Sequence, residues 1–205
     1  HLVGRGAVFG CQHADAKFHL GFPCQSGVYI VTMCKQKRED IKMRYFEYKN
    51  APFAIREDLK IAHQAYWDRL AQPGSWWTGA QRVAIAKESR HARDCEFCKK
   101  RKTSLSPYTG KNDHSRVTDL NEKTIDAIHR VMTDQNRIAR KYIEENHESD
   151  LSEEAYVELT GIVVAVISID EFHRGIGVAL EPLPEPIGGE PDHYRPDNLV
   201  RDTGF

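Results

Sequence analysis

The chain has 205 residues, of which 40% are hydrophobic and 29% are charged, a composition typical of globular proteins. Its 29 Lys and Arg residues nearly balance its 30 Asp and Glu residues, and the formal net charge is −1. This balance argues against a general nucleic-acid binder, and no apolar run approaches the roughly 20 residues that span a bilayer. We therefore expect neither nucleic acid nor a membrane among its partners.

The five cysteines stand at positions 11, 24, 34, 95 and 98. They are too few and too widely spaced for a disulfide-stapled secreted scaffold, and the start of the chain has no sustained apolar stretch typical of a secretory signal. We therefore expect a cytoplasmic protein. In that compartment a close cysteine pair is typical of catalysis or metal binding rather than of a structural disulfide.

Residues 1–50 predict an irregular N-terminal extension, because five glycines interrupt its first part and no helical period survives (Gly4, Gly6, Gly10, Gly21 and Gly27). We interpret this segment as upstream or tag sequence, or alternatively as a weakly ordered extension that packs on a partner subunit. Residues 182–205 contain five prolines and predict an extended C-terminal arm.

The intervening segment, 51–181, has the apolar spacing of helices and no convincing strand alternation. The expected helices cover 54–71, a segment from an N-cap at Thr78 to Ala92, a short basic segment after Asp94, a long segment from an N-cap at Asn121 through Ile143, and a last segment from an N-cap at Ser152 to Gly175 or Gly177. Residues 104–118 predict a loop. The fold class is therefore all-α, a helical bundle of about five helices.

The motif that carries chemistry is Cys95-Glu96-Phe97-Cys98. A CxxC at the start of a helix places two sulfurs within reach of each other, and the free N–H groups of the first turn stabilise a thiolate there. From Arg93 to Lys102 there are five basic and two acidic residues, a local balance of 5 − 2 = +3. Positive surroundings lower a thiol pKa and make the thiol a better nucleophile.

Three interpretations of this pair remain open at the level of residues. A redox dithiol attacks a peroxide, passes through a sulfenic acid and closes to a disulfide. A zinc site needs four ligands, so the pair would have to recruit two more from Cys11, Cys24, Cys34 or the histidines, among which no second pair has ligand spacing. The third interpretation is two buried structural cysteines.

Candidate proton-transfer partners lie on both sides of the motif. Glu88, His91, Cys95 and Cys98 follow one another at steps of 3, 4 and 3, so they share a face if one helix runs through them unbroken. His173 and Glu158 are 15 residues apart, about four turns, and lie near one face of the last helix. The alternative for His91 and Glu158 is a solvated side chain, and His129, among apolar positions, is interpreted as a core or interface histidine.

The order of these features resembles the AhpD-like alkylhydroperoxidases of the carboxymuconolactone decarboxylase superfamily, with the peroxidase-related subgroup as the most similar type. The resemblance runs from about Pro52 to Arg195 and is carried by WTGAQRVAIA at 77–86, the Cys95–Cys98 motif, LSEEAYVEL at 151–159 and FHR at 172–174. It implies an all-helical fold, reduction of hydroperoxides by thiol–disulfide exchange, no bound cofactor or metal, and a homo-oligomer.

Two family positions differ here. The family has a Glu twelve residues before the first cysteine, where this chain has Val83, and a His four residues after the second, where it has Lys102. Replacement relay residues are expected among Glu88, Glu158, His91 and His173, with His173 preferred. The resemblance implies that Cys98 reacts with peroxide and Cys95 resolves, whereas a helix that starts after Asp94 favours Cys95.

The expected function is therefore a thiol peroxidase with a hydroperoxide substrate and an external dithiol reductant, such as a thioredoxin-like or lipoyl protein. The alternative is a non-catalytic oligomeric binding or redox-sensing member of the same fold. The decarboxylase or lactonase chemistry of relatives without a CxxC is disfavoured by the intact pair. Trp76, Trp77, Tyr66, Trp67 and the C-terminal arm are candidates for subunit contacts or, alternatively, for internal packing.

Overall fold

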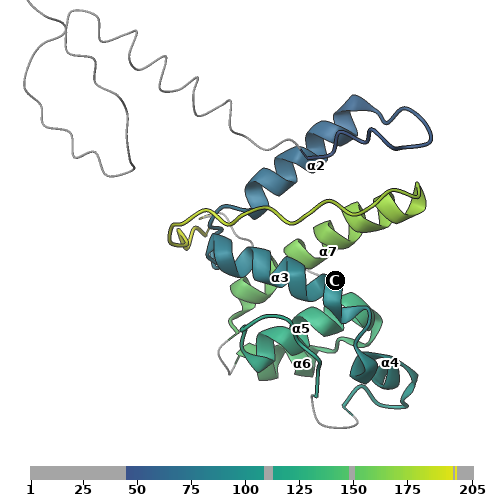
Figure 1. Cartoon of the computed structure of the whole chain (residues 1–205). Coiled ribbons are helices and arrows are strands. Elements are labelled where there is room, and N and C mark those ends of the chain that lie inside the picture. Colours follow the sequence, from purple (N-terminus) through teal and green to yellow (C-terminus); the bar gives the residue numbers. More distant parts are fainter. Residues whose placement is uncertain (1–44, 109–112, 148–150, 196, 198–205) are drawn as a thin grey trace, which may run out of the picture. The chain divides into compact units, whose positions relative to one another are not determined.

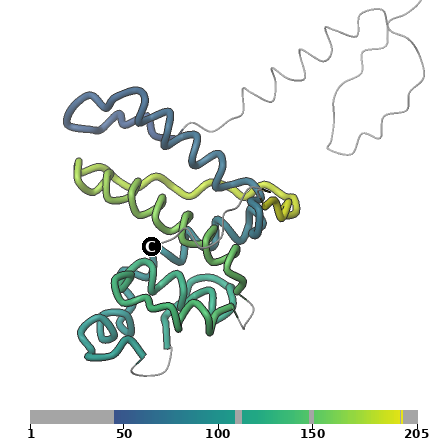
Figure 2. Tube along the Cα trace, turned by 180° about the vertical axis from the view of Figure 1, so that it is seen from behind, coloured from purple at the N-terminus to yellow at the C-terminus, as the bar shows by residue number. Residues whose placement is uncertain are grey.

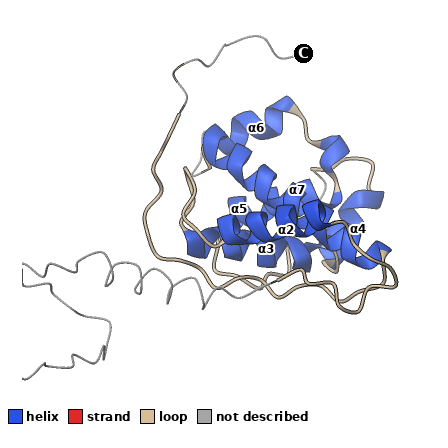
Figure 3. Cartoon of the chain, turned by 90° about the horizontal axis from the view of Figure 1, so that it is seen from above, coloured by secondary structure: helices blue, strands red, loops and turns tan. Residues whose placement is uncertain are grey.

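The structure is a computed structural model that describes residues 45–108, 113–147, 151–195 and 197. In this part of the chain the regular elements are helices, joined by loops (Figures 1 and 3). They are α2 (Glu57–Leu70), α3 (Gly79–Ala92), α4 (Glu96–Thr103), α5 (Glu122–Thr133), the 3-10 helix η1 (Gln135–Arg137), α6 (Arg140–His147) and α7 (Glu153–Gly175). The all-α prediction is thus confirmed, and no helix in the described ranges has the length and apolarity to cross a bilayer.

Three predicted N-caps are confirmed by their hydrogen bonds. The Thr78 hydroxyl accepts from the backbone N–H of Gln81, whose side chain in turn accepts from the backbone N–H of Thr78, a complete capping box. Asn121 and Ser152 cap α5 and α7 through a single side-chain acceptor each. These caps satisfy backbone donors that the first turn of a helix leaves free.

Two predicted helix boundaries are wrong. The helix expected from Asn121 through Ile143 ends at Thr133, because Asp134 leaves the helical region (φ −150°, ψ 35°) and its carboxylate holds the Arg137 guanidinium with two contacts of 2.7 Å. This local ion pair stabilises a 3-10 turn in place of a continuous helix. The short helix expected directly after Asp94 begins one residue later, at Glu96, with Cys95 as its N-cap.

Helices α3, α5 and α7 pack against one another and enclose the core (Figures 1 and 2). The buried apolar side chains come from all three helices and from α2 (Trp67, Leu70, Ile85, Ile128, Leu159, Val163 and Val166). The packing of α7 explains its long uncharged stretch, since its buried residues face both α3 and α5.

The compact helical unit begins earlier than the predicted boundary at residue 51. The chain divides into the units His1–Met43 and Arg44–Phe205, and the first of these lies outside the described residues, as does most of the predicted 1–50 extension. Phe46 is buried against Trp67 and His173. Residues 45–50 therefore belong to the helical unit.

The described part of the C-terminal arm, up to residue 195, contains no helix and lies against the helices (Figure 2). The Trp67 indole donates to the carbonyl of Pro182 at 2.8 Å, and the backbone N–H of Ile187 donates to the carbonyl of Ala71 at 2.7 Å. Trp67 and Trp77 are buried within the chain, so internal packing accounts for both.

A core substitution in α7 tests this packing. Leu159 is 0% exposed, so Leu159→Ala is expected to lower the free energy of unfolding by about 2–5 kcal/mol through lost apolar burial and a residual cavity. Val164, on the same helix and 51% exposed, is the matched control, and Val164→Ala should cost about 0.5 kcal/mol or less. Urea unfolding followed by circular dichroism measures both, and equal losses would contradict the assignment of the buried face.

Candidate functional site

The two cysteines of the CxxC motif lie at the start of α4. Cys95 is the N-cap and Cys98 lies in the first turn, and both are free thiols. They are also nearly inaccessible, with 0% and 2% of their surface exposed. The fold therefore brings the pair together, as the motif predicts, but beneath the surface.

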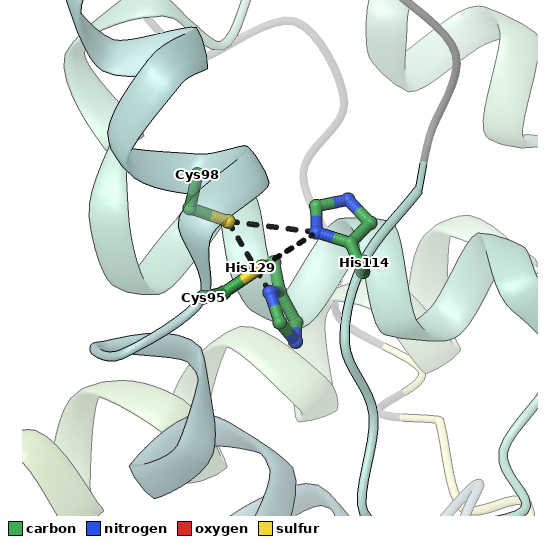
Figure 4. A group of neighbouring side chains, drawn as sticks. All are labelled: Cys95, Cys98, His114 and His129. Carbon is green, nitrogen blue, oxygen red and sulfur yellow. Dashed lines mark hydrogen bonds between the residues drawn. The ribbon is translucent and has the colours of Figure 1, made fainter.

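Two histidines from other segments meet these sulfurs (Figure 4). His129 of α5 places its Nδ1 3.2 Å from Cys98 Sγ. His114, from the loop before α5, places its Nδ1 3.5 Å from Cys98 Sγ and 3.7 Å from Cys95 Sγ. One ligating atom from each of the four residues lies within 4.8 Å of all the others. We call Cys95, Cys98, His114 and His129 the Cys2His2 cluster.

Each imidazole is held from behind by a buried carboxylate. His129 Nε2 lies 3.1 Å from Glu88 Oε1, and His114 Nε2 lies 3.0 Å from Asp126 Oδ1. Such partners fix the orientation and tautomer of an imidazole, so that the Nδ1 atom is directed at the sulfurs. Glu88 also accepts from the backbone N–H of Val117 and from the Thr118 hydroxyl.

The surroundings separate the two thiols electrostatically. Burial opposes ionisation of Cys95, but hydrogen bonds from the backbone N–H of Cys98 and from His114 and Ser115 lower its pKa to about 5. Burial raises the pKa of Cys98 to about 12, against the Thr133 hydrogen bond and the charge of Arg101 and reinforced by the neighbouring Cys95 sulfur. Cys95 is thus the thiolate of the pair and Cys98 the thiol.

Of the relay residues predicted from sequence, Glu88 is in place and the others are not. His91 lies on the side of α3 next to the cluster, where its Nε2 is 3.1 Å from Ser115 Oγ. Among the described residues it makes no hydrogen bond to either sulfur. The preferred candidate, His173, is buried elsewhere, with its Nδ1 2.8 Å from the carbonyl oxygen of Ile169 and its ring against Phe46 and Tyr48. The structure does not bring His173 to the cysteine pair.

Glu158 also lies apart from the cluster. Its carboxylate pairs with the Arg82 guanidinium and accepts from the backbone N–H of Trp76 at 2.7 Å. These residues line a separate groove of about 820 Å³ between α2, α7 and the C-terminal arm. Helical spacing places Glu158 and His173 on one helix but does not indicate which neighbours they meet.

The sequence patterns do not single out the two histidines of the cluster. His129 is interpreted from sequence as a core or interface residue because it lies among apolar helix positions, and His114 lies in a segment predicted only as loop. Their partners are 12 to 41 residues away along the chain. The available signal is the pattern Asp126-x-x-His129. It puts the carboxylate that holds His114 and the imidazole of His129 on one turn of α5.

Asp126 joins the cluster to the helices around it, and its removal tests this role. The carboxylate pairs with Arg101 at 2.7 Å and with Arg130 at 2.8 Å, and it accepts from the Tyr142 hydroxyl at 2.8 Å. Asp126→Asn leaves two buried guanidinium groups short of a charge partner, so we expect a loss of about 3–5 kcal/mol in unfolding free energy. Exposed Asp58, paired with Arg56, gives the control Asp58→Asn, which should leave the unfolding free energy nearly unchanged.

The pH dependence of stability gives a second measurement of the same prediction. Burial opposes ionisation of Asp126, but the His114 hydrogen bond and the Arg130 and Arg101 charges hold its pKa well below the usual range. A lowered folded-state pKa stabilises the fold above the unfolded value of about 3.9, and this stabilisation is lost as the pH falls below it. The Asp126→Asn variant lacks this carboxylate, so its unfolding free energy should fall less between neutral and acid pH than that of the parent. Identical acid unfolding transitions for the variant and the parent would contradict the prediction.

Comparisons with models of protein families, with curated proteins and with solved structures find no match to this chain. The AhpD-like resemblance therefore stays a prediction from the quoted motifs. Chemistry is assigned to the Cys2His2 cluster from its geometry and from the two carboxylates that hold its imidazoles.

Proposed function

We propose that the chain is a thiol peroxidase, which reduces hydroperoxides while Cys95 and Cys98 are oxidised to a disulfide. The observation that carries the proposal is the buried series of contacts from Cys98 through His129 to Glu88. A thiol next to an imidazole that a carboxylate orients is the arrangement by which a base activates a nucleophile. The resemblance to the AhpD-like alkylhydroperoxidases points to the same chemistry.

In the first step the Cys95 thiolate attacks the peroxide. An S–O bond forms as the O–O bond breaks, and the leaving alkoxide takes a proton and departs as an alcohol, or as water from hydrogen peroxide. His114, with its Nδ1 3.7 Å from Cys95 Sγ, is placed to supply this proton. The N-cap position of Cys95 supports this order, which reverses the roles that the family resemblance implies.

In the second step Cys98 resolves the sulfenic acid. His129, supported by Glu88, takes the Cys98 proton, and the resulting thiolate attacks the sulfur of Cys95. The S–S bond forms, hydroxide leaves, and the proton held by His129 converts it to water. An external dithiol, of the thioredoxin-like or lipoyl type, then reduces the disulfide by exchange, and this cycle needs no bound cofactor.

A second candidate is a non-catalytic redox-sensing member of the fold, and the burial of both sulfurs favours it. With 0% and 2% exposure, neither sulfur meets a peroxide unless the residues over the cluster move. A sensor tolerates slow oxidation, whereas a turnover enzyme does not. The two candidates therefore differ in rate and not in the bond that is formed.

The cysteine roles can be tested by trapping the intermediate. Cys98→Ser is expected to abolish turnover but to form one sulfenic acid on Cys95 with stoichiometric peroxide, which dimedone labels and mass spectrometry locates. Cys95→Ser should form none. In the unaltered chain the peptide containing both residues should lose two thiols per peroxide, and unchanged thiols would refute the proposed function. Labelling of Cys98 in Cys95→Ser would instead overturn the order of attack.

The proton relay can be tested with histidine variants that keep a hydrogen-bonding side chain. His129→Gln should lower kcat for peroxide reduction on the order of 10²–10⁴-fold, because the resolving thiol loses its base. His147→Gln, at the exposed end of α6, is the matched control and should retain the activity, as should His173→Gln. Equal losses in all three variants would indicate a structural effect and contradict the relay.

A further inference from the structure

The Cys2His2 cluster has the composition and spacing of a closed metal site as well as of a dithiol. Two cysteine sulfurs and two imidazole nitrogens form a set that binds zinc tetrahedrally in proteins. With Zn–S bonds of about 2.3 Å and Zn–N bonds of about 2.05 Å, the S···N edge of a tetrahedron is about 3.6 Å. Three of the four S···N distances are 3.2, 3.5 and 3.7 Å, and ligating atoms of all four residues lie within 4.8 Å of one another, so small shifts bring the donors to the corners that such an ion requires.

The residues behind the cluster also match a metal site. Both imidazoles direct Nδ1 inward and contact a carboxylate with Nε2, at 3.0 Å for His114 and 3.1 Å for His129. Carboxylates in this position orient a ligating histidine and raise its basicity.

The charges around the cluster balance once a divalent cation is included. Glu88 and Asp126 supply two negative charges, and Arg101 and Arg130 supply two positive charges. Two thiolates would add two uncompensated negative charges to this buried volume. A dication between them restores neutrality, which a low-dielectric interior demands.

We propose that the reduced chain binds one Zn²⁺ ion in the Cys2His2 cluster. All four corners are protein donors, so the ion has no open position and holds the segment of His114 to α4 and α5 rather than acting on a substrate. This assignment departs from the expectation of a metal-free site that the family resemblance implies. It stands on the geometry of the cluster alone.

The ion and the disulfide exclude each other. This second part of the inference rests on the proposed function. When a hydroperoxide oxidises the zinc-bound pair, the two thiolates give up two electrons and form the S–S bond, and both Zn–S bonds break. The hydroperoxide takes these two electrons and two protons from the buffered solvent, its O–O bond breaks, and it becomes an alcohol and water. Zn²⁺ is released, because two imidazoles alone remain as ligands.

The metal site is tested with Co²⁺ as a spectroscopic probe for Zn²⁺. The full chain carries Cys11, Cys24 and Cys34 outside the described residues, so the titration uses the variant with all three changed to Ser, reduced and freed of metal. One equivalent of Co²⁺ should produce thiolate-to-cobalt charge-transfer bands and intense visible bands of a tetrahedral ion, and Zn²⁺ should displace it. Absence of these bands, or a weak octahedral spectrum, would overturn the proposal.

Variants assign the ligands. Glu88→Gln, which removes the carboxylate that holds His129, should weaken Co²⁺ binding about 10–100-fold. Cys98→Ser and His129→Ala each remove a ligand and should weaken it further. His147→Ala, at the exposed end of α6, is the control and should bind as the parent does. Equal affinities for the His129 and His147 variants would also overturn the assignment, and circular dichroism confirms that each variant remains helical.

Two further measurements separate this proposal from the proposed function. The parent oxidised to the Cys95–Cys98 disulfide should give no cobalt bands, and peroxide added to the zinc form should release one Zn²⁺ to a chromogenic chelator. Peroxide consumption is followed separately in metal-free protein. Metal binding without peroxide consumption leaves the zinc site standing and removes the peroxidase, whereas peroxide consumption without metal binding does the reverse.

Discussion

The Asp126 carboxylate accepts hydrogen bonds from side chains of four different segments: Arg101 of α4, His114 of the preceding loop, Arg130 of α5 itself and Tyr142 of α6. A buried carboxylate is tolerated only when its lone pairs are used and its charge is compensated, and here both conditions are met. The same interaction therefore docks α4 and α6 on α5 and fixes the imidazole that faces the sulfurs. Packing and site geometry are not separable at this residue.

Glu88 has the corresponding role on the other side of the cluster. Its carboxylate holds His129 and also binds Val117 and Thr118, so the loop that carries His114 is tied to α3. Two carboxylates thus position two imidazoles, and each imidazole reaches the sulfurs from its own direction. Val83 of α3 and Lys102 of α4 occupy the two positions at which the AhpD-like pattern has its Glu and His, and in this chain Glu88 and His129 make the carboxylate–imidazole contact instead.

Local signals in the sequence predict much of the fold. Thr78, Asn121 and Ser152 are predicted as caps because a short polar side chain before an apolar period has a definite local function, and all three have it in the structure. The break at Asp134 is not predicted, since an ion pair to Arg137 outweighs an apolar period that continues past it. Local patterns indicate the helix propensity of a segment, and a specific contact such as this ion pair can override that propensity.

The candidate site can be predicted only as far as its local part. Cys95 and Cys98 are evident from their spacing, whereas His129 meets Glu88 across 41 residues, a contact that only the packing of α3 on α5 creates. His173 is preferred from the family resemblance, and the fold turns it toward Phe46 and Tyr48. Helical periodicity gives the face of a side chain but not the element that covers that face.

Nucleophile and metal ligand make the same demand on a cysteine, because both require the thiolate. The features that lower the Cys95 pKa and orient the two imidazoles therefore serve either use. A bound ion keeps the sulfurs apart in their tetrahedral corners, while the S–S bond requires them at covalent distance. In the proposed scheme the disulfide withdraws both sulfur ligands in one step, so the cluster would have two end states and no stable half-oxidised metal form. Such a switch would report oxidation through the loss of a structural link between α4, α5 and the His114 loop, which gives the buried position of the pair a physical purpose in the redox-sensing candidate.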